Sequence, residues 1–463
     1  MNTRANLPLY SSLLYQEARS WTEDLPVCKN SGIGLSTNAV YREDDHRQED
    51  HEFEDQSFHI KYNDKISLYG IFDGHEGVQF AKYAVDTITA EILLELDGEK
   101  SDKEVKQVLK QAFNTVEKNY LEAIGDKLAE KASLQMEIPE DVTPYEAYQK
   151  YPAQIEKLKT INTELSCGTT AVVSLIYNDR LYVANVGDCR ALICKTDADG
   201  VLKVIPLSQD HNLSNEDEVL RLVNLGMSLK NIRKGFRFGN HENTRCLGNY
   251  LVKGGYKEFE ELSCASAEPV IAEPEITEGK LLDKSYRFLM LMSSGLYRSL
   301  EDATGTTSVN KEIAQMVVEQ FRIQSTLTGV AQAVVDKVVR IHHDAYMSRT
   351  GTERAVVSKR EDITLLIRNF NFPLPHAISP VSCPSVNFEM MQQREESRES
   401  TQEDSNDTID SKESTVDSSQ TSTEKSVLVS AKTVKPYVDF SNYYAEVEKA
   451  RINGDLPDGI EFF

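Results

Sequence analysis

Basic residues are scarce in this sequence. Its 463 residues include 51 lysines and arginines against 74 aspartates and glutamates, which gives a formal net charge of −23. Nucleic acids and anionic membrane surfaces attract basic protein faces, so this charge argues against both as the main partner. We therefore expect no nucleic acid and no membrane among the partners, and basic or neutral proteins in their place.

Paired cysteines and long apolar runs are also missing. The seven cysteines have no framework spacing and form no CxxC pair, which indicates a reducing compartment and no zinc site. The first residues lack the apolar core of a signal peptide, and no later run approaches the length of a membrane span. We expect a cytosolic or nuclear protein, and place it in the cytoplasm.

Alternating apolar segments and helical stretches predict a folded α+β domain over residues 21–372, after a lead-in of residues 1–20. Strand-like runs include ISLYGIFDG, RFLMLMSSG and DITLLIRNF. Helices are expected at Val78 to Leu96, Asp102 to Ile124, Asn215 to Leu225 and Asn310 to Tyr346. This mixture predicts helices packed on antiparallel sheets. The dense acidic run from Glu43 to Asp55 predicts an exposed loop.

The texture changes after Phe372. Residues 373–433 are rich in Ser, Thr, Glu and Asp, a composition that buries too little apolar surface to fold, so we expect a disordered linker. Ser379 precedes Pro380 and is a candidate proline-directed phosphosite, although a single dipeptide of this kind commonly arises by chance.

A short amphipathic segment follows at residues 434–463. Phe440, Tyr443, Tyr444 and Val447 fall on one helical face, and Asp439 can cap the start of the helix. A helix this short is marginal alone in water. It is therefore expected to form when it docks, either in a groove of another protein or on its own domain.

Candidate chemistry lies at strand ends. Asp73 in FDGHEG follows an apolar strand and could hold a hard cation, although Asp-Gly is also a common turn. Glu361 and Asp362 precede another strand and could converge on the same sheet edge. Asp188 in ANVGDCRAL has a structural role as its simpler interpretation.

The ordered series FDGHEG, CGTTAVV, LYVANVGDCRAL, DHNLSNEDEVLRLVNLGM, TRCLGN, FLMLMSSGL and EDITLLI resembles the motifs of the metal-dependent type 2C serine/threonine phosphatases. The resemblance covers about Trp21 to Phe370. It implies a central β-sandwich flanked by helices, with two divalent cations in a cleft at one end of the sheets. Two such ions lower the pKa of a bridging water and clamp phosphate oxygens.

The same resemblance implies a damaged centre. Asp73 and Gly74 match metal-binding positions, but Ser294 replaces an aspartate ligand, and Glu361 stands where the family has the aspartate of a DN motif. The segment GLSTNAVY aligns with the place of a phosphate-binding arginine and an acidic pair and supplies neither, and Asn249 replaces the usual aspartate. Each such loss typically costs about 10²- to 10³-fold in rate. The resemblance implies a pseudophosphatase with no catalytic residues and no required cofactor, and leaves open a residual Mn or Mg ion at Asp73.

A narrower resemblance joins the domain to the tail. SWTEDLPVC, DKLAEKASLQ and PYVDFSNYY are similar to segments of a family of adaptors that bind TGF-β-activated kinase. It implies that the tail binds the kinase catalytic domain and promotes its autophosphorylation. The implied docking residues are Tyr437, Val438, Asp439, Phe440, Tyr443, Tyr444 and Val447, with Phe440 as the anchor.

Further implied partners are an inhibitor-of-apoptosis protein and a stress-activated MAP kinase. Two alternatives stay open: a true phosphatase with an altered metal centre, and a phosphoprotein-binding module, which the missing arginine disfavours because phosphate recognition prefers a guanidinium.

Overall fold

Two antiparallel sheets form the centre of the protein. The computed structural model describes residues 20–42, 46–139, 142–197, 200–234 and 237–375. One sheet has the order β1 (Ser31–Ser36), β15 (Ile363–Asn369), β13 (Tyr286–Met292), β8 (Arg190–Thr196) and β9 (Leu202–Pro206). The other has the order β11 (Glu275–Ile276), β7 (Arg180–Val186), β6 (Gly168–Tyr177), β5 (Ile66–His75) and β4 (Gln56–Lys61), with β10 (Leu247–Gly248) on β6 and β12 (Lys280–Leu281) on β7. A small third sheet joins β14 (Lys359–Arg360), β2 (Ala39–Tyr41) and β3 (Arg47–Gln48).

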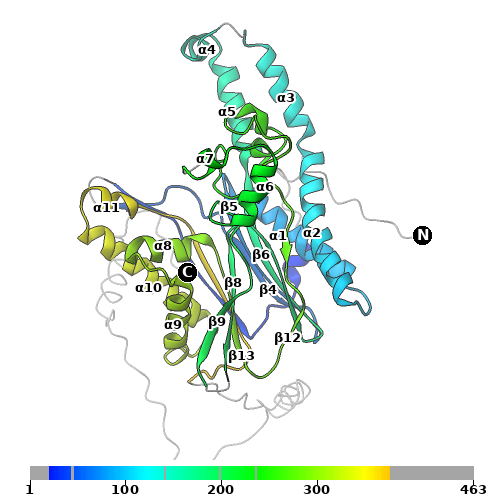
Figure 1. The fold of residues 1–463 in the computed structure, drawn as a ribbon, viewed down its shortest axis with the longest axis vertical. Helices are drawn as coiled ribbons and strands as arrows, with labels where there is room; N and C mark the ends of the chain where they lie inside the picture. Colours follow the sequence, from blue (N-terminus) through cyan, green and yellow to red (C-terminus); the bar gives the residue numbers. More distant parts are fainter. Residues whose placement is uncertain (1–19, 43–45, 140–141, 198–199, 235–236, 376–463) are drawn as a thin grey trace, which may run out of the picture. The chain divides into compact units, whose positions relative to one another are not determined.

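Helices cover the outer face of each large sheet, as Figure 1 shows. One side carries α1 (Val78–Glu95) and α2 (Asp102–Ala123), and the other carries α8 (Ser294–Thr304), α9 (Val309–Phe321) and α10 (Leu327–Ser348). The remaining helical elements are η2 (Trp21–Asp24), α3 (Gly125–Met136), α4 (Pro144–Lys150), α5 (Pro152–Ser166), α6 (Glu216–Asn224), α7 (Leu229–Ile232), η3 (Tyr250–Val252), η4 (Tyr256–Glu258) and α11 (Gly351–Val356). The α+β sandwich expected from the sequence is confirmed.

Strand alternation explains why the sheets are buried on both faces. In β5, Leu68 and Phe72 pack under α1 and α2, whereas Tyr69 and Ile71 pack between the sheets. The alternate residues of β13 divide between α8 to α10 and the sandwich interior in the same way. Successive side chains of a strand point to opposite faces, so these continuous apolar runs suit strands that are covered twice.

The contact between β1 and α10 depends on two glycines. A Cβ atom on Gly32 would lie 2.2 Å from the backbone of Leu327, and one on Gly34 would lie 2.5 Å from that of Ala331. The absence of these side chains therefore lets the helix backbone rest directly on the strand.

Most predicted helices lie where the sequence placed them. The structure differs over Asn310 to Tyr346, which was predicted as one helix and forms α9 and α10. Thr326 explains the second start, because its side chain accepts a hydrogen bond from the amide of Gly329 at 3.1 Å and caps α10. The projecting helices α3, α4 and α5, visible at the top of Figure 1, were not anticipated. In the part of the chain that is described, no helix is both long and apolar enough to span a membrane.

Candidate functional site

The end of β5 meets the start of α8, so the two sheets contribute to one site. Asp73 lies near the end of β5, and Ser294 is the first residue of α8, directly after β13. The amide and the hydroxyl of Ser294 both donate to Asp73 Oδ2, at 2.9 and 2.7 Å. Ser294 therefore does face Asp73, but it faces it as a hydrogen-bond donor.

Glu54 and Asp55 complete this site, and the sequence interpretation missed them. The acidic run to which they belong was expected to be an exposed loop, but Glu54 is 9% and Asp55 2% exposed. Glu54 Oε1 accepts from the amide of Gly77 at 2.6 Å, and Asp55 Oδ2 accepts from the hydroxyl of Thr364 at 2.7 Å. Their burial could have been suspected from the sequence, because they directly precede β4, a strand in which apolar and polar residues alternate.

Gly74 brings the Glu54 segment close to β5. A Cβ atom on Gly74 would lie 2.6 Å from the carbonyl oxygen of Glu54. A larger residue at this position would push the Glu54 segment away from Asp73. The close packing therefore requires a glycine here, independently of the metal-binding role expected from the sequence.

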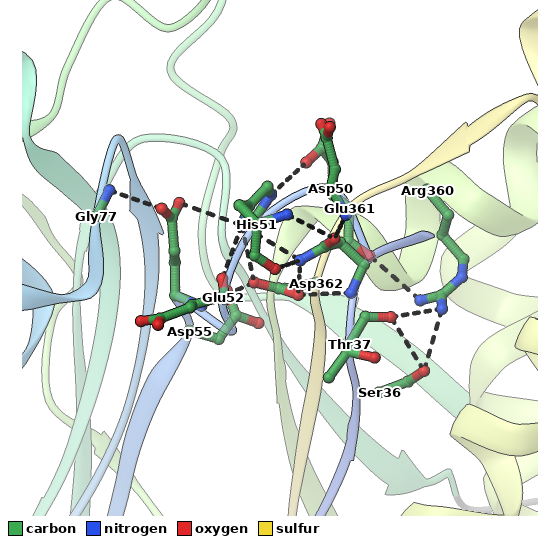
Figure 2. A network of polar contacts seen from close by, with 12 residues as sticks. Ser36, Thr37, Asp50, His51, Glu52, Asp55, Gly77, Arg360, Glu361 and Asp362 are labelled. Atoms are coloured by element: carbon green, nitrogen blue, oxygen red, sulfur yellow. Dashed lines mark hydrogen bonds and ion pairs between the residues drawn. The ribbon is translucent and has the colours of Figure 1, made fainter. Parts of the chain in front are cut away.

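The two neighbouring carboxylates before β15 point in different directions (Figure 2). Asp362 has a side chain that is 5% exposed and accepts from the Asn38 amide at 2.6 Å and the Glu54 amide at 2.8 Å. Glu361 has a side chain that is 48% exposed and lies 3.9 Å from His51 and 3.4 Å from Lys359. The structure thus puts Asp362, and not the expected Glu361, in the buried network.

A buried arginine lies beside residues 34–41, the segment GLSTNAVY, which itself contains no arginine. Arg360 is 3% exposed, and its guanidinium donates to the carbonyl of Thr37 at 2.5 Å and to the hydroxyl of Ser36 at 3.2 Å. Burial is the main reason that the pKa of Arg360 falls to about 10. The guanidinium therefore binds the last residue of β1 and the residue that follows it, which holds this strand end in place.

Crowded carboxyl groups in the site resist ionisation. Burial, with a further contribution from the charge of Asp188, raises the pKa of Asp73 to about 6 against the hydrogen bonds from Ser294. Burial also raises the pKa of Glu54 to about 7, although His51 opposes this. The pKa of Asp55 is raised well above its ordinary value by burial and then by the charge of Asp73. Three neighbouring carboxyl groups therefore lack sufficient positive charge around them.

The two halves of this site fit a metal ion differently. On the Glu54 side, Asp55 Oδ1 is buried without a hydrogen-bond partner, and carboxylate oxygens are the ligands that Mg²⁺ and Mn²⁺ prefer. These residues fit one hard cation, although within the described ranges no three His, Cys, Asp or Glu side chains are already arranged as ligands. On the Ser294 side, the donors on Asp73 Oδ2 do not fit a cation.

Three polar residues lie near the end of β5 that carries Asp73: His75, His241 and Asn249. The rings of His75 and His241 lie tilted against each other with their centroids 4.7 Å apart, and His75 Nε2 lies 3.3 Å from Asn249 Nδ2. Burial, followed by the nearby His241, lowers the pKa of His75 well below its ordinary value. Asn249 contributes a neutral amide here, so these three residues bring no negative charge to the site.

The predicted tail sites lie outside the described residues. These are the kinase-binding residues Tyr437, Val438, Asp439, Phe440, Tyr443, Tyr444 and Val447, and the phosphosite candidate Ser379. The linker of residues 373–433 is described only as far as Pro375. The tail therefore remains a prediction of the sequence.

Comparison with known proteins agrees with the sandwich fold. The family model described as protein phosphatase 2C matches residues 122–344, a range that includes Ser294 but not Glu54, Asp73 or Asp362. A curated relative from Caenorhabditis elegans, TGF-beta-activated kinase 1 and MAP3K7-binding protein 1, is 26% identical over 348 residues, covering 74% of this chain and 82% of the relative.

Two further similar proteins are named as phosphatases. Probable protein phosphatase 2C 27 of Oryza sativa subsp. japonica is 25% identical over 355 residues, covering 74% of this chain and 85% of that protein. The crystal structure of a serine-threonine phosphatase 2C from Toxoplasma gondii is 16% identical, with a TM-score of 0.43, and covers 75% of this chain and 97% of that one.

Proposed function

We propose that this chain, which matches the protein phosphatase 2C family model over residues 122–344, is a catalytically inactive adaptor in the cytoplasm that binds TGF-β-activated kinase, a MAP kinase kinase kinase. It activates the kinase by promoting autophosphorylation, and so scaffolds stress and inflammatory signalling. The observation that carries the loss of catalysis is the pair of hydrogen bonds from Ser294 to Asp73, at 2.9 and 2.7 Å. The kinase partner is supported by the similarity to the Caenorhabditis elegans binding protein, which extends over 82% of that relative.

The absence of a ligand at position 294 affects the reaction directly. A metal ion supplies a nucleophilic water and holds the phosphate oxygens when it is bound in such a centre. Ser294 offers hydrogen-bond donors at the position where a two-metal centre needs an anionic oxygen, and its hydroxyl already binds Asp73. Asp362, another carboxylate of the site, accepts from Asn38 and Glu54. Donors of the chain itself therefore occupy carboxylate oxygens that would otherwise be available to a cation.

Kinase activation needs no catalysis by this chain. A segment that binds the active arrangement of a kinase more tightly than the inactive one shifts the equilibrium towards the active form. In this proposal the segment is residues 434–463, with Phe440 as the aromatic anchor. The folded domain is then a platform, and the inhibitor-of-apoptosis protein and the stress-activated MAP kinase remain expectations from the sequence alone.

The decisive experiment is kinase autophosphorylation with the purified full-length chain. Wild type and Asp73→Asn are expected to activate the kinase equally, whereas Phe440→Ala is expected to lose most of the activation. Phe462→Ala is the matched control, because it removes an aromatic side chain from the same tail but lies outside the predicted helical face. Equal activation by Phe440→Ala and wild type would refute the docking assignment, and no activation by wild type would refute the adaptor.

A divergent metal-dependent phosphatase is the second candidate. It is favoured by the crowding of Glu54, Asp55 and Asp73, three carboxyl groups with raised pKa values, one of which has an unpartnered buried oxygen. A cation bound there would be held by these three residues, and it would polarise a water molecule. Release of phosphate from a phosphoprotein in manganese, abolished by Asp73→Asn, would establish this function. Equal background release by both proteins would exclude it.

A further inference from the structure

A partly exposed guanidinium group lies against the buried carboxylate of Asp188. Arg298 lies one helical turn after Ser294 on α8, so both side chains emerge on the same side of the helix. Arg298 Nη2 donates to Asp188 Oδ2 at 2.7 Å, and Nη1 donates to Glu242 Oε2 at 3.1 Å. The side chain of Asp188 is 3% exposed. This is a charge-assisted pair whose acidic partner is buried.

Every oxygen of Asp188 is engaged around this cation. Oδ1 accepts from the Asn243 amide at 2.7 Å, and Oδ2 accepts from the hydroxyl of Tyr297 at 3.1 Å as well as from Arg298. The simpler interpretation of Asp188 as a structural residue is consistent with these contacts. Both carboxylate oxygens of Asp188 therefore already accept a hydrogen bond, and Oδ2 also carries the charged guanidinium of Arg298.

The same turn of α8 also contacts the other carboxylate of this half of the site. Ser294, one turn before Arg298, donates to Asp73 Oδ2 from its amide at 2.9 Å and from its hydroxyl at 2.7 Å. Successive turns of α8 thus contact Asp73 through neutral donors and Asp188 through a positive charge. A divalent cation bound by these acids would likewise supply positive charge to them.

We infer that the guanidinium of Arg298 takes the place of one of the two cations of a type 2C centre, so that this site accepts at most one metal ion. This inference rests on the proposed function, because it compares the site with the two-metal centre of a phosphatase. It identifies Arg298 as the group that replaces the missing metal ion. Ser294 and Arg298 act together. Ser294 provides no anionic ligand for a second cation, and Arg298 supplies the positive charge that this cation would have supplied. A dication beside Arg298 would meet like-charge repulsion at short range.

The inference separates the effects of the two residues. If only the ligand at position 294 were missing, Ser294→Asp would restore the second metal position. If Arg298 occupies the position, Ser294→Asp gains no ion, and the new carboxylate pairs with the guanidinium. Removing the charge of Arg298 as well is then required before a second cation can enter.

Native mass spectrometry of the full-length chain with manganese tests this by counting bound ions. Wild type and Ser294→Asp are expected to bind the same number, at most one, and Ser294→Asp with Arg298→Ala is expected to bind one more. Ser294→Asp with Arg322→Ala is the matched control, since it has the same net charge but loses an exposed arginine on the far end of α9. It should bind no more than wild type.

Three results would overturn the inference: two ions in wild type, an additional ion in Ser294→Asp alone, or no additional ion in the folded double variant. Ser294→Asp with Arg298→Gln guards against misfolding, because glutamine can still donate to Asp188 without a charge. The count in wild type remains decisive even if both double variants unfold. Kinase activation is a separate readout, so failure of this inference is distinguishable from failure of the adaptor function.

Discussion

Replacing Glu54 with glutamine should change how the stability of the domain depends on pH. The folded chain holds the pKa of Glu54 at about 7, against 4.5 for an ordinary glutamate, mainly because the group is buried. A raised carboxyl pKa means that the folded state binds its proton more tightly than the unfolded state. The contribution of the protonated Glu54 to the free energy of unfolding is therefore fully present below pH 4.5 and is lost as the pH rises through 7.

The size of the effect follows from this difference. It corresponds to about 3 kcal/mol of stability lost between pH 4.5 and alkaline pH, as an upper value, since each pKa unit is worth about 1.4 kcal/mol. Glu54→Gln keeps an oxygen for the Gly77 amide, which donates to Glu54 at 2.6 Å. It cannot ionise, so the variant should gain stability at pH 8 and gain much less at pH 4.5.

Urea unfolding in EDTA at a series of pH values measures this directly. Wild type should lose stability from pH 5 to pH 8 more steeply than Glu54→Gln. Glu52→Gln is the matched control, because Glu52 is an exposed glutamate two residues earlier. Parallel pH profiles for wild type and Glu54→Gln would refute the assignment of a raised pKa to Glu54, and a flattened profile for Glu52→Gln would show that the change of net charge alone is responsible.

Two further substitutions test the packing around the site. Gly295→Ala would place a Cβ atom 1.9 Å from a backbone oxygen just before β15 and should destabilise the domain by about 2 kcal/mol or more in urea unfolding, whereas Gly125→Ala, with open space around it, should be near neutral. Lys253→Met should cost about 3 kcal/mol in the same assay, because it leaves the largely buried Glu117, 2.6 Å away, without its cation. Lys118→Met loses only an exposed ion pair and should cost less than about 1 kcal/mol. Equal losses for the two variants would contradict a buried ion pair between Lys253 and Glu117.

The outline of the domain could be read from the sequence because it depends on local patterns. The apolar runs of β5 and β13 and the periodicity of α1 and α2 predicted their elements closely. The break between α9 and α10 was missed, since the cap at Thr326 interrupts a continuous helical pattern. Glu54 and Asp55 were missed for a different reason: an acidic run normally stays in water, and only contacts with Gly77 and Thr364 show that these two residues are buried.

The sequence by itself determined the α+β class and the position of Asp73 at a strand end, and it placed the neutral Ser294 where the resemblance leads us to expect an aspartate. Only the tertiary structure decided which charged groups meet in the site. Asp362 and Glu361 are neighbours just before β15, yet the side chain of Asp362 is buried at 5% exposure and that of Glu361 is 48% exposed. Asn38 and Asp362, and Asp188 and Arg298, are far apart in the chain and meet because strands from both sheets end at one place. Local patterns cannot carry that information, since it arises from the pairing and stacking of distant strands.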